Sequence, residues 1–184
     1  MMAALGLIIL FLSIVRSSLN QTLAAEKEDR LRKIPISIEG YSYRLPEVRT
    51  LPISPWYIIK DIRDKLWIGL CRNRGERVRL LLLLSDKKIT ETRALFARTY
   101  AKKALEAAGR GVDKLKYTAE IWEEMDDKEI GKKELGKQIY KAGLVYKEVL
   151  LRVSSVVDID QEDCLNIIQD LDEWNERQKE KKIE

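Results

Sequence analysis

The stretch "LPISPWYIIKDIRDKLWIGL" (residues 51–70) passes from a proline-rich loop directly into an apolar helix. Ser54 is a favourable N-cap residue and proline is favoured at the first helical position, so we expect the helix to begin at Pro55. Its apolar residues recur at three- and four-residue spacing, which is one helical face: Ile59, Ile62, Leu66 and Leu70. Trp56 and Trp67 widen this face. The pattern is typical of the first helix of a helical domain.

The same spacing predicts four further helices downstream, at about 76–98, 100–125, 128–157 and 160–181. The second contains five consecutive leucines, Leu80 to Leu84, which should be covered on several sides. The third carries a stripe of small residues, Ala104, Ala108 and Gly111, that lets another helix approach closely. We therefore expect an all-α fold, an antiparallel bundle of about five helices over residues 56–182.

Residues 26–55 read as an extended arm that precedes the bundle. All four prolines of the chain lie between residues 34 and 55, and proline removes a backbone donor and disfavours helix in the residue before it. Closely spaced prolines stiffen the arm, so docking it costs less conformational entropy. We expect residues 41–55 to pack Tyr43 and Trp56 onto the bundle.

The first 25 residues read as a signal peptide or a short N-terminal anchor. The apolar run Leu5–Val15 has the length of a secretory core and is too short to span a membrane, although no Lys or Arg precedes it. An amphipathic helix buried in the domain is the alternative. The export interpretation predicts an extracytoplasmic protein, secreted or associated with the envelope, that meets the membrane only through this segment.

The composition limits the kinds of metal site and enzymatic activity that the chain can support. The chain has no histidine, the commonest general base and zinc ligand, and only two cysteines, so we expect no metal site, no cofactor and no enzymatic activity. A hydrolase that uses carboxylates in a groove between helices is the alternative. Cys71 and Cys164 could form a disulfide in an exported protein, but two buried thiols are the favoured interpretation.

The charges are distributed unevenly along the chain. Residues 25–123 carry 22 Lys and Arg against 14 Asp and Glu, whereas residues 124–184 carry 11 against 16. A basic half can indicate nucleic-acid binding, but the basic residues here are interleaved with acids. We expect two halves that attract each other, and nucleic acid is an unlikely partner.

The segments "YSYRLPEVRTLPISPWYIIKDIRDKLWI" and "LLLLLSDKKITETRALFARTYAKKALEAA" resemble a family of exported bacterial helical domains of unknown function. The resemblance covers about residues 41–122. Its matching positions are Tyr43, Leu45, Pro46, Leu51, Pro52, Ser54, Pro55, Tyr57, Lys60, Arg63, Asp64, Asp86, Lys87 and Lys88. The family's usual acidic start of the second helix is replaced here by "NRGERVR". The resemblance implies export and a helical fold, and it brings no assigned activity.

A helical hairpin folded about Gly75 places residues opposite each other when their numbers add to about 150. We expect Asp64 to pair with Lys87 or Lys88, and Arg63 with Asp86, as a charged clasp between the first two helices. A functional charged site at these positions is the alternative.

These observations favour a non-catalytic helical module that binds a protein partner at the cell envelope, or has a structural role there. The sequence does not identify that partner or the oligomeric state. The residues expected to form its partner-binding or structural motif are Tyr43, Pro46, Pro52, Ser54, Pro55, Trp56, Tyr57, Arg63, Asp64, Asp86 and Lys88.

Overall fold

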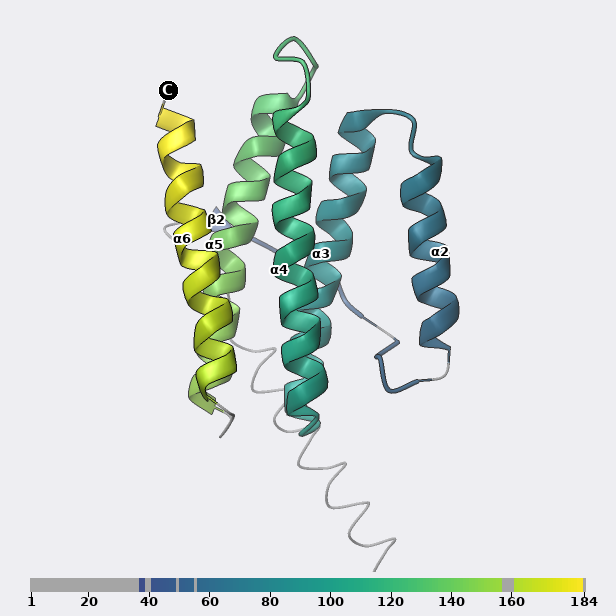
Figure 1. Ribbon diagram of the computed structural model, residues 1–184, viewed down its shortest axis with the longest axis vertical. Helices are drawn as coiled ribbons and strands as arrows, with labels where there is room; N and C mark the ends of the chain where they lie inside the picture. The colour runs from purple at the N-terminus through teal and green to yellow at the C-terminus, as the bar shows by residue number, and fades with distance from the viewer. Residues whose placement is uncertain (1–36, 39–40, 49, 55, 157–160, 184) are drawn as a thin grey trace, which may run out of the picture.

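The computed structural model describes residues 37–38, 41–48, 50–54, 56–156 and 161–183. This part of the chain contains five α-helices that run as an antiparallel bundle (Figure 1). They are α2 (Tyr57–Leu70), α3 (Arg74–Ala97), α4 (Ala101–Glu123), α5 (Lys132–Val156) and α6 (Gln161–Ile183). The predicted fold class is confirmed. The expected export segment, residues 1–25, and Pro55 lie outside the described residues.

The helix ends follow local chemistry. Asn73 caps α3, because its side chain accepts a hydrogen bond from the Glu76 amide at 3.3 Å. Thr99 adopts a left-handed backbone with φ of 64°, which ends α3 and lets α4 begin. The expected Ser54 cap is wrong. The helix α2 begins at Tyr57 after Trp56, and Ser54 supplies only its backbone carbonyl, which accepts from the Tyr57 amide at 3.0 Å.

The most extensive helix pair is α3 with α4. Gly111 makes the close approach possible, because a Cβ there would lie 3.0 Å from the Ile89 Cδ1 atom. The Ser85 hydroxyl donates to the Gly111 carbonyl at 2.6 Å and so fixes the two helices together. The small-residue stripe of the sequence therefore has its predicted role.

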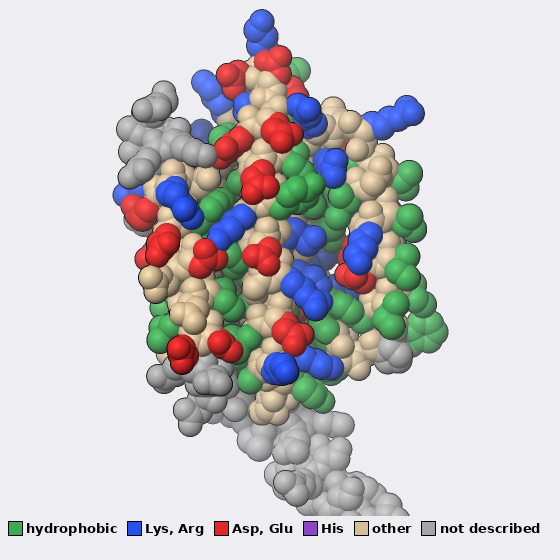
Figure 2. Space-filling view, in the orientation of Figure 1, with side chains coloured by type: hydrophobic (Ala, Val, Ile, Leu, Met, Phe, Trp, Pro, Cys, Tyr) green, Lys and Arg blue, Asp and Glu red, His purple; other side chains and the backbone are tan. Residues whose placement is uncertain are grey.

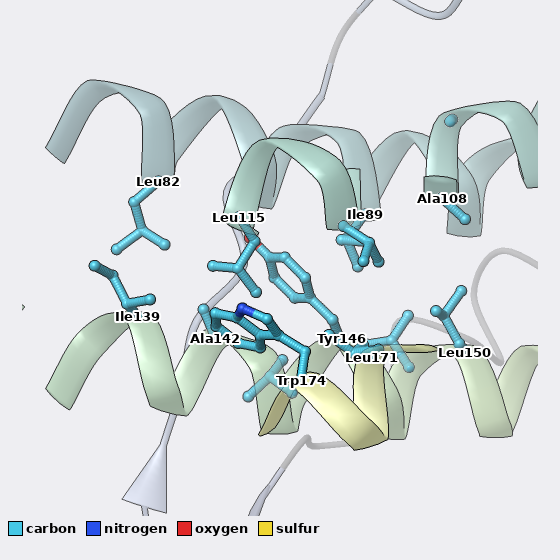
Figure 3. Close-up of a cluster of buried hydrophobic side chains, with 14 of the residues drawn as sticks. Leu82, Ile89, Ala108, Leu115, Ile139, Ala142, Tyr146, Leu150, Leu171 and Trp174 are labelled. Carbon is cyan, nitrogen blue, oxygen red and sulfur yellow. The ribbon is translucent and has the colours of Figure 1, made fainter. Parts of the chain in front are cut away.

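The helices α5 and α6 close the core on the other side (Figure 3). Its largest fully buried side chains include Tyr146, Leu115 and Leu171. Three members of the leucine run are buried, whereas Leu83 is 40% exposed, so the run is covered on most sides but not all. Both cysteines are free thiols, with Cys164 in the core.

The described part of the arm contains two short antiparallel strands, β1 (Ser37–Ile38) and β2 (Tyr41–Ser42). Residues 43–48 and 50–54 form neither helix nor strand. Leu51 is buried, and Leu45 and Val48 pack against the core. The arm is therefore docked on the bundle ahead of α2.

Candidate functional site

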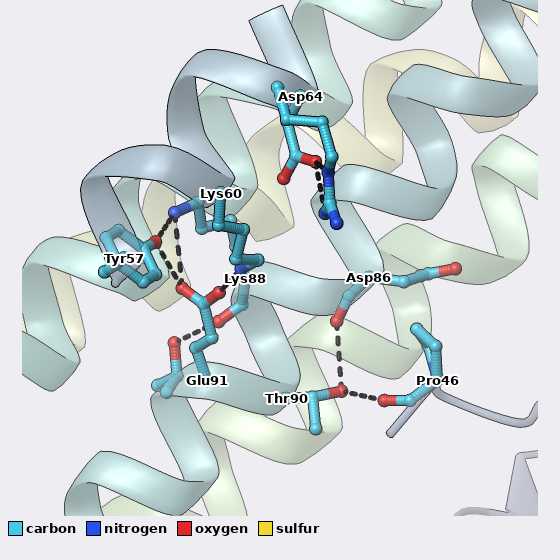
Figure 4. Close-up of polar contacts among 10 residues, drawn as sticks. Pro46, Tyr57, Lys60, Asp64, Asp86, Lys88, Thr90 and Glu91 are labelled. Atoms are coloured by element: carbon cyan, nitrogen blue, oxygen red, sulfur yellow. Dashed lines mark hydrogen bonds and ion pairs between the residues drawn. The ribbon is translucent and has the colours of Figure 1, made fainter. Parts of the chain in front are cut away.

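The seam between α2 and α3 is built from charged and polar side chains. Glu91 of α3 is fully buried, and its carboxylate receives a hydrogen bond from the Tyr57 hydroxyl at 2.8 Å. Lys60 of α2 forms an ion pair with one carboxylate oxygen, and the Lys88 ammonium lies 3.2 Å from the other (Figure 4). Lys88 also donates to the Tyr57 hydroxyl. We call these four residues the Glu91 cluster.

Burial sets the charge states in this cluster. Desolvation and the nearby Glu91 carboxylate raise the pKa of Tyr57. Its phenol therefore stays protonated and can donate its hydrogen bond to Glu91. The Lys60 and Lys88 nitrogens lie 4.8 and 4.7 Å from the centre of the Tyr57 ring, within reach of a cation–π attraction. One carboxylate thus faces two ammonium groups, which fastens the first turns of α2 to α3 and leaves a local excess of positive charge.

A second buried carboxylate joins the arm to the bundle. Asp86 of α3 accepts hydrogen bonds from the Tyr43 hydroxyl at 2.9 and 3.0 Å and from the Tyr146 hydroxyl at 2.8 Å. Burial raises the pKa of Asp86 to about 6, and the two hydroxyl groups partly oppose that shift by stabilising the charged form. One turn further, the Thr90 hydroxyl donates to the Pro46 carbonyl at 2.9 Å. Tyr43 is therefore docked as expected.

The expected charged clasp is wrong in its partners. Asp64 accepts from its own neighbour Arg63, at 2.7 and 3.1 Å. Asp86 faces the arm and α5, where two tyrosines satisfy it, and Lys88 pairs with Glu91. The seam is instead closed by contacts of Tyr57 and Lys60 with α3.

The sequence interpretation missed Glu91, the residue at the centre of the seam. A signal for it was present, because a hairpin about Gly75 places Lys60 opposite Glu91. Of the predicted motif, the seam contains Tyr57 and Lys88, and the arm contact contains Tyr43, Pro46 and Asp86. Pro52 lies beside Tyr57 in a small pocket. The structure does not bring Ser54, Trp56, Arg63 and Asp64 into either cluster.

The opposite side of α2 is apolar and exposed. No residue of α2 is buried, and seven large apolar side chains on or next to it are between 48% and 76% exposed. We call them the outer face of α2: Trp56, Ile58, Ile59, Ile62, Leu66, Trp67 and Leu70. Figure 2 shows hydrophobic side chains, in green, along the edge of the molecule that α2 forms. The expectation that Trp56 docks on the bundle is wrong, because it is 70% exposed.

Charged residues flank the outer face in an ordered way. Helical spacing puts Lys65 beside Ile58 at one edge of the apolar stripe, and Arg63 within its other side between Leu70 and Trp67, whose ring lies 5.0 Å from the Arg63 guanidinium. The side chains of Lys65 and Arg63 are 76% and 47% exposed. The acids Asp61 and Asp64 lie closer to α3, with side chains 45% and 14% exposed. Asp61 pairs with Lys65 at 3.2 Å and Asp64 with Arg63 at 2.7 Å, so the charges beside the outer face form two ion pairs whose more exposed members are the cations.

The described part of the chain contains no group of three or more Cys, Asp or Glu side chains that could hold a metal ion. None of its helices has the length and the apolar character needed to cross a membrane.

Comparisons with protein-family models, with curated proteins and with solved structures find no match to this chain. The resemblance to exported helical domains of unknown function therefore stays a prediction from the sequence motif.

Proposed function

We propose that this chain is a non-catalytic helical module that binds a protein partner at the cell envelope, and that the outer face of α2 is its docking surface. The observation that carries the proposal is the orientation of α2, which turns its polar side to the bundle and its apolar side to solvent. Monomeric proteins rarely expose contiguous apolar patches beyond about 300–600 Å² unless the patch has a function. Covering these side chains removes apolar surface from water and so drives association.

The chemistry of the surface defines the partner. The 14 residues of α2 extend about 21 Å, which suits a side-by-side contact with a second helix of similar length. Lys65 and Arg63 are the more exposed members of their ion pairs with Asp61 and Asp64, so they favour acidic residues beside the partner's apolar stripe. The proposed partner segment is thus an amphipathic helix with acidic flanks.

The envelope location rests on the expected export segment, residues 1–25. Mass spectrometry of the protein purified from its own cells tests that part separately. A mature N-terminus near Ala25 or Glu26 supports export, and an intact Met1 in a cytosolic fraction contradicts it.

A pair of synthetic helical peptides tests the docking surface. Both carry the same leucine stripe, one with glutamates and the other with lysines on its flanks. Titration against the purified protein is followed by calorimetry and by the emission of Trp56 and Trp67, which shifts to the blue when these rings leave water. The proposal predicts saturable binding of the glutamate peptide, at least about tenfold tighter than the lysine peptide.

Two matched variants locate the binding. Ile62→Asp places a charge in the centre of the outer face and is expected to abolish the binding. Leu165→Asp changes an apolar side chain on α6 that is 55% exposed and is expected to leave the binding unchanged. Equal binding of both peptides, or equal loss in both variants, would contradict the proposal.

Carboxylate-dependent hydrolysis remains the alternative function, because a carboxyl group with a pKa near 6 resembles a general acid. Asp86 is 7% exposed, however, and tyrosine hydroxyls occupy its oxygens. Its position supports a structural role in docking the arm better than a role in turnover.

A further inference from the structure

A small pocket lies on a different side of α2 from the outer face, where α2, α3 and α4 meet. It has a volume of about 210 Å³ and is lined by Pro52, Tyr57, Lys88, Lys103, Glu106, Ala107 and Arg110. We call it the Arg110 pocket. Lys and Arg side chains gather between α4 and α2 in Figure 2. The pocket is large enough for a small polyatomic ion and its first waters.

The lining carries more positive than negative charge. Lys103 and Arg110 stand on the α4 side with exposed side chains, and neither forms a hydrogen bond or an ion pair with another described residue. Lys88 enters from α3 with a side chain only 12% exposed. Glu106 is the one acid of the lining, so three cations face a single carboxylate.

The Glu91 cluster behind the pocket does not cancel this excess. Its single carboxylate is shared between Lys60 and Lys88, so the cluster itself has one uncompensated positive charge. Concentrated, partly buried charge of one sign is costly unless an opposite charge reaches it.

The pKa of Lys114, further along α4, responds to the same positive charge. This pKa is lowered, first by burial and then by the positive charge of Lys88, even though Asp61 and Asp64 act in the opposite direction. The charge of Lys88 thus acts on Lys114 as well as on the pocket, and Asp61 and Asp64 partly offset it there.

We propose that the Arg110 pocket binds a small oxyanion, a phosphate or carboxylate group, held between Arg110 and Lys103 of α4 and the Lys88 ammonium of α3. The planar guanidinium of Arg110 can donate two parallel hydrogen bonds to such a group. The lysines add charge without a fixed direction, which suits an oxyanion of either shape. A bound anion connects α4 with the α2–α3 seam and offsets the excess charge of the Glu91 cluster.

Titration of the purified full chain tests this site. Inorganic phosphate and acetate are the two probes, each added at constant ionic strength with chloride as the balancing ion, and binding is followed by calorimetry and by amide chemical shifts. We expect saturable binding of at least one probe, with shifts centred on Tyr57, Lys88 and Arg110. Binding of phosphate alone assigns a phosphoryl ligand, and binding of acetate alone assigns a carboxylate such as an acidic side chain.

Matched variants separate a built site from general attraction to a basic surface. Arg110→Gln is expected to weaken binding by about tenfold or more, because it removes a charged hydrogen-bonding partner. Lys102→Gln removes an exposed charge next to Lys103 on the same helix, outside the lining of the pocket, and is expected to change affinity less than twofold. Failure of both probes to saturate, or equal weakening in both variants, would overturn the proposal. Neither result bears on the outer face of α2, whose test uses different residues.

Discussion

Helices α2 and α4 carry the same kind of apolar stripe and use it in opposite ways. In α4 the stripe of Ala104, Ala108 and Leu115 is fully buried among neighbouring helices. In α2 the stripe of Ile62, Leu66 and Leu70 is more than half exposed. Apolar periodicity therefore identifies a face of a helix, but it does not say whether the same chain covers that face.

The difference follows from what each helix has on its other side. The polar side of α4 meets solvent, whereas the polar side of α2 contains Tyr57 and Lys60, which reach the buried Glu91 of α3. A buried carboxylate left unpaired would be costly, so these contacts fix the orientation of α2 even though its apolar residues gain nothing from it. Polar and charged contacts therefore hold α2 on α3, and its apolar face is left exposed to solvent.

The largest expected effect on the free energy of unfolding comes from a substitution in the buried apolar stripe of α4. Leu115→Ala removes a fully buried side chain of α4 and leaves a cavity, so the free energy of unfolding should fall by about 2–5 kcal/mol. Urea denaturation followed by circular dichroism measures it. A loss below about 1 kcal/mol would mean that the α4 stripe is not the centre of the core.

Loss of the contacts that hold α2 on α3 should have a smaller effect on the free energy of unfolding. Glu91→Gln leaves Lys60 and Lys88 without a carboxylate, and we expect a loss of about 1–3 kcal/mol in the free energy of unfolding. Trypsin should also cut at Lys60 and Arg63 faster in this variant. Glu120→Gln, on the exposed side of α4, is the matched control and should change the free energy by less than about 0.5 kcal/mol.

A double-mutant cycle then isolates the ion pair. The combination of Glu91→Gln with Lys60→Met should give a coupling energy of about 0.5–3 kcal/mol. Additive effects of the two substitutions would show that Lys60 and Glu91 do not interact, and the account of how α2 is oriented would fail.

Much of the fold could be predicted from the sequence, because helix boundaries depend on local chemistry. Proline, the Asn73 cap and the Thr99 break place most helix ends within two to four residues of the expected positions. The hairpin register was also right. The choice of partners within that register was not, because Asp86 is taken by Tyr43 and Tyr146, which lie 43 and 60 residues away. Contacts of that range depend on how the whole bundle closes, and a single sequence does not encode them in a local pattern.

The burial of Asp86 should make stability depend on pH. The pKa of Asp86 is raised to about 6 in the folded protein, against about 4 in an unfolded chain. The folded state therefore binds a proton that the unfolded state releases between these values, so the contribution of Asp86 to stability is largest below about pH 4 and is lost as the pH rises through 6.

Asp86→Asn removes this titration and keeps the shape of the side chain. The difference in the free energy of unfolding between wild type and variant should change by about 1 kcal/mol or more between pH 4 and pH 7, in favour of wild type at low pH. Urea denaturation at several pH values measures it. A difference that does not depend on pH would mean that burial does not raise the pKa of Asp86 in the folded protein.

The smallest expected effect tests the central claim most directly, namely that the described part of the chain leaves the outer face of α2 uncovered. Ile62 is 54% exposed at the middle of that face. The measurement is the free energy of unfolding of Ile62→Asp in the full chain, beside wild type. The account predicts a change of no more than about 0.5 kcal/mol, as for other exposed positions. A loss of more than about 2 kcal/mol would show that Ile62 is buried by another part of the chain, and would contradict the outer face of α2 as a free docking surface.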